Sequence, residues 1–255
     1  MADVVALADA HAPEGSTVIA EEQTAGRGRH GRSWDSARYA GLWLSLLLRP
    51  SGVPPEALGW LPLAVGIGVV RGIAAKSGSR PALKWPNDVV VARPDGVAKL
   101  AGILAERLPD GAVVVGIGIN VDHRADELPQ GATSLRCEAA PAPLGDPARV
   151  DVLVGVLAEV ADVYRHWTSG GDLSEEYRRR CITLGHHVRM STPGPGARDP
   201  DRQAGRLGRP DGDPDRVIAG RAEDIDDLGR LIVVDEHGSR TALAAGEVAL
   251  VRPVR

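Results

Sequence analysis

The stretch ALKWPNDVVVARPDGVAKLAGILAERL (82–108) decides the fold, because it joins two apolar runs through a turn. The runs, residues 82–91 and 98–108, are rich in Val, Leu and Ile, and the Pro-Asp-Gly between them favours a hairpin. A third run, AVVVGIGINV (112–121), follows soon after. Runs of this length, bounded by turn-forming residues, are typical of buried strands. The sequence therefore predicts a mixed, largely antiparallel sheet.

Helices are expected to back this sheet, which makes the fold class α/β (α+β). Residues 54–78 begin with prolines and end with glycine, so they predict a long, mostly buried helix whose start Pro62 bends or delays. Asp172 and Glu175 resemble a capping box at the start of another helix. Residues 122–149 are polar and rich in Pro and Ala, which predicts a loop. Further strands are expected at 16–23 and 41–50, and further helices within 1–15, 147–167 and 172–181.

The sequence changes character after Gly185, where short apolar runs alternate with turn residues. This pattern predicts a small all-β domain. The intervening residues 192–215 are dominated by Gly, Pro, Asp and Arg, and we expect a mobile loop there. The expected division is a first domain over 1–183 and a second over 184–255. The strands expected in the second domain are HHVRMS, RVIAGRAEDID, RLIVVDE and GEVALVRP.

Composition narrows the class of protein. The chain has 255 residues, a net charge of −4 and no Phe, so Leu, Val, Ile and Ala must form the core. The near-neutral charge argues against bulk binding of a polyanion. Cys137 and Cys181 lie far apart without metal-ligand spacing, which favours a reducing, cytoplasmic setting. No run approaches the ~18–20 apolar residues of a membrane span, and the start of the chain lacks the basic cluster of a signal peptide.

The loop EEQTAGRGRHGRSW (21–34) combines glycines, arginines and Trp34. Glycines let backbone amides approach a ligand, arginines suit phosphate and carboxylate, and a tryptophan face can stack on a purine. The loop therefore predicts a clamp for a nucleotide-like ligand. A solvated loop or an RGG-type nucleic-acid segment is the alternative. No GK[ST] follows, so this is not a Walker loop.

Three motifs on the predicted strands point to the same kind of site. In KWPND (84–88), Lys84 lies in an apolar run, which is explained by an anion in a cleft or by an edge-strand lysine that reaches solvent. Gly102 of KLAGIL interrupts a strand, which marks either a ligand or a packing bulge. In GIGIN (116–120), two glycines clear one strand face, and Asn120 carries the donor and acceptor that an adenine edge requires.

In this order, GRGRHGR, KWPND, KLAGIL and GIGIN resemble the motifs of bacterial biotin protein ligases, the biotin–[acetyl-CoA-carboxylase] ligases. The resemblance covers nearly the whole chain. It implies a class II synthetase-like catalytic domain followed by a small SH3-like barrel. It also implies an enzyme that uses ATP and Mg²⁺ to convert biotin to biotinoyl-5′-AMP and then transfers biotin to one lysine of a biotin carboxyl carrier domain.

The resemblance also assigns roles to residues. Lys84 and Arg29 are implied to be catalytic, with Lys84 between the biotin carboxylate and the phosphate and Arg29 shielding the mixed anhydride from water. Trp34 is implied to cover the adenine, and Gln23 to bind the ureido group of biotin. The implied biotin-binding residues are Gln23, Gly26, Arg27, Arg29, Lys84, Gly102, Ile103 and Gly116. The implied residues for ATP and the adenylate are Arg27, Arg29, Arg32, Trp34, Lys84 and Asn120. No metal ligand is assigned.

One departure from the family concerns the start of the chain. Family members carry a Ser/Thr-Asn stretch just before the first helix, and Met1-Ala2-Asp3 stands there instead. We expect either a start further upstream or weaker binding of biotin. No helix-turn-helix precedes the catalytic region, so the monofunctional type is expected, without a nucleic-acid or membrane partner. A monomer and a homodimer both fit.

Three other functions fit parts of this sequence. A lipoate–protein ligase or octanoyltransferase shares the implied fold, but GRGRHGR differs from the arginine motif of those relatives. A non-catalytic regulator would bind biotin or nucleotide without releasing pyrophosphate. An RGG-type nucleic-acid binder would show steep salt dependence, and the near-neutral charge argues against it.

Overall fold

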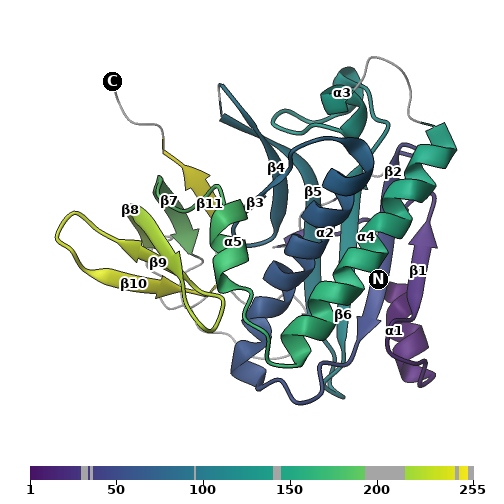
Figure 1. Cartoon of the computed structure of the whole chain (residues 1–255), viewed down its shortest axis with the longest axis horizontal. Helices are drawn as coiled ribbons and strands as arrows, with labels where there is room; N and C mark the ends of the chain where they lie inside the picture. Colours follow the sequence, from purple (N-terminus) through teal and green to yellow (C-terminus); the bar gives the residue numbers. More distant parts are fainter. Residues whose placement is uncertain are drawn as a thin grey trace, which may run out of the picture.

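The computed structural model consists of two β-sheets with helices (Figure 1). The larger sheet and its helices lie on the right in Figure 1, and the smaller sheet lies on the left. The structure describes residues 1–29, 34, 37–94, 96–139, 145–192, 216–244 and 247–251.

Six strands form the larger sheet, in the order β1-β2-β6-β5-β4-β3. Every described pair of neighbouring strands is antiparallel. Parallel contacts among the described residues are two isolated bridges, Leu83 with Cys181 and Lys99 with Ala132. The largely antiparallel sheet that the sequence predicts is therefore confirmed. The strands are β1 (Thr17–Ala20), β2 (Gly41–Leu48), β3 (Ala82–Lys84), β4 (Asp88–Arg93), β5 (Gly96–Arg107) and β6 (Val113–Asn120).

The core lies on one face of this sheet, under α2 (Leu61–Ser77) and α4 (Gly145–Thr168) (Figure 1). Successive side chains of a strand point to opposite faces, so alternate residues of β2, such as Leu44 and Leu46, pack against these helices. A fully buried leucine contributes about 1.5–3 kcal/mol relative to an exposed one. This face is therefore a continuous apolar layer, as the Leu- and Val-rich composition requires.

Two glycines of α2 let the covering helices approach each other closely. A Cβ atom on Gly68 would lie 2.6 Å from the Cα atom of Val160, and one on Gly72 would lie 2.5 Å from the Cα atom of Val156. No side chain fits in either place. Helices α2 and α4 therefore pack tightly against each other over one face of the sheet, and the opposite face is where a cavity can form.

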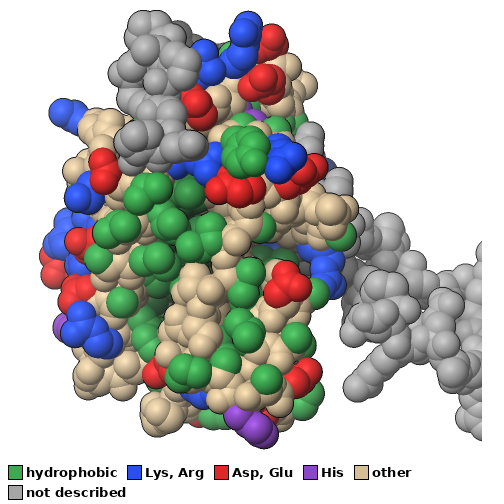
Figure 2. Space-filling view, turned by 90° about the vertical axis from the view of Figure 1, so that its right-hand side faces the viewer, with side chains coloured by type: hydrophobic (Ala, Val, Ile, Leu, Met, Phe, Trp, Pro, Cys, Tyr) green, Lys and Arg blue, Asp and Glu red, His purple; other side chains and the backbone are tan. Residues whose placement is uncertain are grey.

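The opposite face is only partly covered. The short helix α1 (Ala2–Asp9) buries Val4 and Ala8 against Leu47 and Val114. The edge of the sheet at β1 faces right in Figure 1, and Figure 2 shows that hydrophobic side chains gather on this side of the molecule. Strand β1 and helix α4 run along this side in Figure 1.

Five antiparallel strands form the smaller sheet, in the order β10-β9-β8-β7-β11. The small SH3-like barrel expected at the C-terminus is confirmed. The boundary between residues 183 and 184 stays a prediction. The strands are β7 (His187–Thr192), β8 (Arg216–Ile225), β9 (Leu231–Val234), β10 (Arg240–Leu243) and β11 (Glu247–Leu250).

Several elements differ from the expectation. The run 82–91 is two strands, because a turn at Trp85–Asn87, with a cis bond before Pro86, separates β3 from β4. The expected helix over 54–78 starts as the 3₁₀ segment η2 (Pro55–Trp60), as Pro62 indicated. The expected loop 122–149 contains η3 (Ala125–Glu127), α3 (Leu135–Ala139) and the start of α4. Strand β10 was not expected.

The capping box predicted at Asp172 is wrong in detail. Helix α5 (Ser174–Arg180) begins after Leu173, and the Asp172 carboxylate accepts the Ser174 N–H at 2.8 Å. The Glu175 side chain pairs with Arg179 instead of reaching back. The expected mobile loop over 192–215 falls, after Thr192, outside the described residues.

One helical segment, Pro55–Ser77, is long and apolar enough to cross a membrane by length and composition alone. Within its most apolar window, 67% of the residues are buried inside the protein. Because α2 packs against the sheet and α4, this burial is typical of the central helix of a core.

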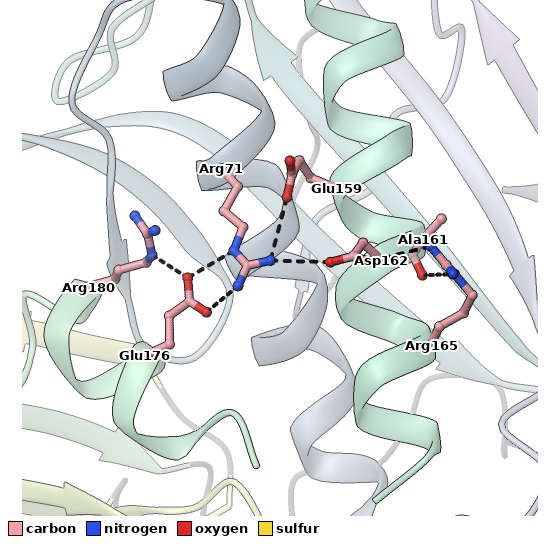
Figure 3. A network of polar contacts seen from close by, with 7 residues as sticks. All are labelled: Arg71, Glu159, Ala161, Asp162, Arg165, Glu176 and Arg180. Carbon is pink, nitrogen blue, oxygen red and sulfur yellow. Dashed lines mark hydrogen bonds and ion pairs between the residues drawn. The ribbon is translucent and has the colours of Figure 1, made fainter. Parts of the chain in front are cut away.

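A polar network fixes α5 to the two core helices (Figure 3). The Arg71 guanidinium donates to both carboxylate oxygens of Glu176, at 2.9 and 2.5 Å. Its Nη1 atom also lies 3.5 Å from Glu159 and 3.6 Å from Asp162 of α4. The hydrogen bond from Arg71 holds the pKa of the Glu176 carboxyl below its usual value, although burial opposes this shift. Arg180 donates to the same carboxylate at 2.9 Å.

We expect Glu176→Gln to lower the free energy of unfolding at pH 7 by about 1–3 kcal/mol, because the substitution removes charge-assisted hydrogen bonds. A carboxyl whose pKa is lower in the folded state stabilises the fold above its unfolded pKa and stops doing so as the pH falls through the folded value. The difference between wild type and variant should therefore shrink below about pH 4. Urea unfolding at several pH values measures it.

The matched control is Glu175→Gln, which removes an exposed ion pair made by the preceding residue of the same helix. It should change the free energy of unfolding by less than about 0.5 kcal/mol. Equal losses for the two variants would contradict the structural role given to the Arg71 network.

Candidate active site

A cavity of about 750 Å³ opens on the face of the large sheet that α1 leaves uncovered. This volume suits a ligand of the size of a drug or nucleotide. Its walls include the central strands, the start of the chain, β1 and the loop after it, the turn between β3 and β4, and Val248 of β11. The smaller sheet therefore contributes to the same cavity.

Three glycines form the floor of the cavity, and we call Gly102, Gly116 and Gly118 the glycine strip. Gly102 of β5 pairs with Gly118 of β6, so the two lie side by side on neighbouring strands. Gly116 lies two residues before Gly118 and faces the same way. The strip leaves the centre of the sheet without side chains, which is what makes room for a ligand.

The indole ring of Trp34 lies over the strip. A Cβ atom on Gly118 would be 3.0 Å from its Cε2 atom, and one on Gly102 would be 2.9 Å from its Cζ3 atom. The Trp34 N–H of the backbone donates to the Gly26 carbonyl at 2.9 Å, which ties the ring to the loop. Trp43 meets the ring edge-on at a centroid distance of 6.3 Å. A flat aromatic surface is thus held inside the cavity.

Two lysines bring positive charge to the cavity. The Nζ atom of Lys99 lies 2.6 Å from one oxygen of Asp88, and the Nζ atom of Lys84 lies 3.8 Å from the other. Lys99 also lies over the Trp34 ring at 5.0 Å. The Lys84 side chain is 19% exposed, so most of its stem is buried while its ammonium group reaches the cavity. One carboxylate between two ammonium groups leaves a net positive charge.

The KWPND turn is fixed on its far side by Asn87. Its amide donates to the Ile103 carbonyl at 2.7 Å, and its backbone carbonyl accepts the Ile103 N–H at 3.0 Å. Its side-chain oxygen accepts a hydrogen bond from Arg29 at 3.1 Å. The glycine–arginine loop and the lysine turn therefore meet at one residue.

The structure brings most of the predicted site residues together. Arg32 lies outside the described residues. The Ile103 side chain belongs to the core on the other face, so the backbone of this residue borders the cavity. The predicted residues that line the cavity are Gln23, Gly26, Arg27, Arg29, Trp34, Lys84, Gly102, Ile103 and Gly116.

Asn120 is the exception among the described candidates. It is buried, it does not line the cavity, and its amide donates to the Thr133 carbonyl at 3.0 Å. The amide therefore holds the loop after β6, and contact with an adenine stays a prediction.

Sequence reasoning missed Lys99, Ser45 and Met1, all of which line the cavity. A signal for Lys99 was available, because KLAGIL places a second lysine three residues before Gly102. Ser45 pairs with Gly116 across β2 and β6, which only the strand register reveals. The Met1 sulfur lies over Gly116, since a Cβ atom there would be 2.8 Å from it.

The described residues contain no group of three His, Cys, Asp or Glu side chains that could hold a metal ion. Asp88, the acidic side chain nearest the lysines, is already paired with them. A magnesium ion at this site would therefore depend on ligand phosphates for most of its coordination, as is common for this ion.

Two family models match the chain. The Biotin/lipoate A/B protein ligase family matches residues 6–123, and the Biotin protein ligase C terminal domain matches residues 212–251. The first match contains the glycine–arginine loop, both lysines and the glycine strip. The second covers β8 to β11.

Similar proteins agree with these family models. The biotin–[acetyl-CoA-carboxylase] ligase of Mycobacterium tuberculosis is 37% identical over 98% of this chain and 85% of that protein. The bifunctional ligase/repressor BirA of Escherichia coli is 40% identical over 44% of this chain and 35% of that protein. The solved biotin protein ligase of Aquifex aeolicus, in complex with biotin and ATP, is 28% identical with a TM-score of 0.73 and covers 97% of this chain and 94% of its own.

If the lysines make the cavity an anion site, Lys99→Met should weaken the binding of inorganic tripolyphosphate by about tenfold, the effect of about 1.4 kcal/mol. The methionine keeps the length and apolar stem of the side chain and removes the charge. Calorimetric titration at low and high salt measures the loss, which should diminish at high salt. Lys76→Met, on the exposed surface of α2, serves as the control and should leave the affinity unchanged. Equal affinity of wild type and Lys99→Met would exclude this anion site.

Proposed function

Because this chain belongs to the biotin protein ligase family, we propose that the cavity over the glycine strip is where it joins biotin to AMP. The enzyme activates biotin with ATP to biotinoyl-5′-AMP and transfers the biotinoyl group to a carboxylase carrier protein. The observation that carries the assignment to this cavity is the meeting of the glycine strip, an aromatic surface and two lysines in one space.

The first step brings two anions together. An oxygen of the biotin carboxylate attacks the α-phosphorus of ATP, the bond from that phosphorus to the bridging oxygen breaks, and pyrophosphate leaves with the electron pair. Repulsion between the carboxylate and the phosphates opposes this approach, so cations between them lower the barrier. Lys84 and Lys99 are proposed to supply this charge. Asp88 is proposed to pair with both ammonium groups until the phosphates bind.

The glycine strip is proposed to hold the fused rings of biotin and the adenylate close to the sheet. Gln23 and Ser45 offer polar groups to the ureido ring of biotin. Trp34 is proposed to cover the nucleotide base from above, since its ring already lies over Gly102 and Gly118. Arg27 and Arg29 border the same space and are proposed to close over the mixed anhydride, which limits its hydrolysis.

In the second step, a lysine amine of the carrier attacks the carbonyl carbon of biotinoyl-AMP and AMP leaves, which forms an amide bond. No nucleophile of the enzyme is required, so catalysis consists of orientation and charge stabilisation. The acceptor is proposed to be the biotin carboxyl carrier domain of acetyl-CoA carboxylase or a related enzyme. We also propose a cytoplasmic location, action on protein rather than nucleic acid or membrane, and a monomer or homodimer.

A magnesium ion bound to the ATP phosphates would neutralise part of their charge in this site. The other positive charges proposed to act in the site are those of the two lysines and the arginines.

The direct test is biotin-dependent exchange of radiolabel between pyrophosphate and ATP. We expect exchange with biotin and none with lipoate, since lipoate activation would indicate the related ligase class. Lys84→Ala should reduce the rate by at least about a hundredfold, because it removes a cation that acts on the developing charge. Lys76→Ala, which changes a lysine outside the cavity, should keep the wild-type rate.

Mass spectrometry of a carrier domain incubated with the enzyme, ATP and biotin then reports the transfer. Binding of biotin without exchange would contradict the proposal and favour a regulatory protein. Equal rates for Lys84→Ala and wild type would show that the reaction does not take place beside the KWPND turn.

A further inference from the structure

The turn between β8 and β9 docks on the catalytic domain through two tryptophans. The indole N–H of Trp85 donates to the carbonyl of Gly229 at 3.0 Å, and the indole N–H of Trp60 donates to the carbonyl of Asp226 at 3.0 Å. Both acceptors belong to one five-residue turn, 226–230. Two hydrogen bonds of the same kind therefore join this turn to different parts of the large domain.

The turn is shaped for this contact. The Asp226 carboxylate accepts the backbone N–H groups of Leu228 and Arg230 at 3.0 and 2.9 Å, which holds the turn in one conformation. Gly59 carries no side chain where the Leu228 carbonyl arrives, and a Cβ atom there would overlap with that carbonyl. A Cβ atom on Gly229 would lie 2.8 Å from the Gly59 carbonyl. Both glycines are needed for this close approach.

Trp85 connects this contact to the reacting centre. It is 1% exposed and directly follows Lys84. Its backbone N–H donates to the hydroxyl of Thr183 at 2.9 Å, and the neighbouring Ile182 N–H donates to the Leu83 carbonyl at 2.7 Å. The backbone beside Lys84 is therefore held by the segment that leads into the barrel, and its neighbouring side chain is held by the barrel itself.

Trp60 differs from Trp85 in one respect. Trp85 lines the cavity, whereas Trp60 lies outside the lining, at the end of η2 and just before α2. There Trp60 packs against Tyr177 of α5 at a ring distance of 5.8 Å. It therefore shares the barrel contact of Trp85 and is not adjacent to a residue of the proposed reacting centre.

We propose that Trp85 is a positioning residue through which the β8–β9 turn of the barrel fixes the Lys84 ammonium group in the active site. The inference rests on the proposed function of Lys84. The barrel then acts on biotin activation through a buried hydrogen bond, in addition to lining the cavity at Val248. Loss of this bond lets the turn that follows Lys84 move, and small displacements of a catalytic group reduce the rate of the chemical step strongly.

The test compares Trp85→Phe with Trp60→Phe. Each substitution keeps an aromatic ring and removes one indole N–H that the turn accepts, although the Asp226 carbonyl keeps a second donor, the Gly229 N–H at 2.9 Å. Both variants should lose thermal stability, a few degrees in Tm, and Trp60→Phe should lose no more than Trp85→Phe. Only Trp85→Phe should lower kcat of biotin-dependent pyrophosphate exchange, by about tenfold, with KM for biotin and ATP changed less than about twofold.

Exchange by the wild type is measured first and separates the two proposals. Absence of exchange in the wild type counts against the proposed function. Wild-type exchange with equal kcat in the two variants, or with an unchanged kcat in Trp85→Phe, overturns the positioning role.

A second pair of variants decides the question if Trp85→Phe does not fold. Gly229→Ala places a methyl group against Gly59, whereas Gly238→Ala has a similar positive φ, +79° against +76°, with no atom within 4 Å of the new Cβ. Both introduce the same backbone strain in the same small domain. The positioning role predicts that Gly229→Ala lowers kcat several-fold more than Gly238→Ala, and equal values overturn it.

Discussion

The function of this protein depends on a sheet in which one face is buried in the core and the other stays open for a ligand. One face of β2, β5 and β6 must bury Leu, Val and Ile under α2 and α4 to stabilise the fold. The other face must remain open, and the glycine strip meets this requirement by removing side chains from the strand centres. Because successive residues alternate between faces, GIGIN supplies isoleucines to the core and glycines to the cavity from one segment. The cavity therefore has a floor of backbone atoms, above which the Trp34 ring and the two lysines lie.

Much of this arrangement could be predicted from the sequence. The strand runs, the core helix and the C-terminal all-β domain follow from apolar periodicity and turn residues, and GIGIN indicated the open face. The split of residues 82–91 was missed because Val, Leu and Trp all favour strands, while Trp85 and Pro86 form a turn held by tertiary contacts. Strand β10 was missed because it is short and mostly exposed.

The site was less accessible to sequence reasoning. Lys99 reaches the cavity through its pairing with Asp88, and Asn120 turns away to bond Thr133, and neither contact has a local signature. Contacts between the domains raise the same difficulty. The carbonyl that Trp85 requires comes from Gly229, which lies 144 residues away in the chain. Long-range register and packing decide such pairs, whereas composition and spacing decide the elements themselves.

The central claim is that the glycine strip is the floor on which the adenylate lies. Calorimetric titration with a non-hydrolysable analogue of biotinoyl-AMP, on wild type and Gly118→Ala, tests it most directly. A methyl group on Gly118 would lie 3.0 Å from the Trp34 ring, so it would displace the ring and narrow the space above the strip in which the ligand is proposed to lie. We predict that the dissociation constant rises by about tenfold or more while Tm stays within a few degrees of wild type. Equal dissociation constants for the two proteins would contradict the account.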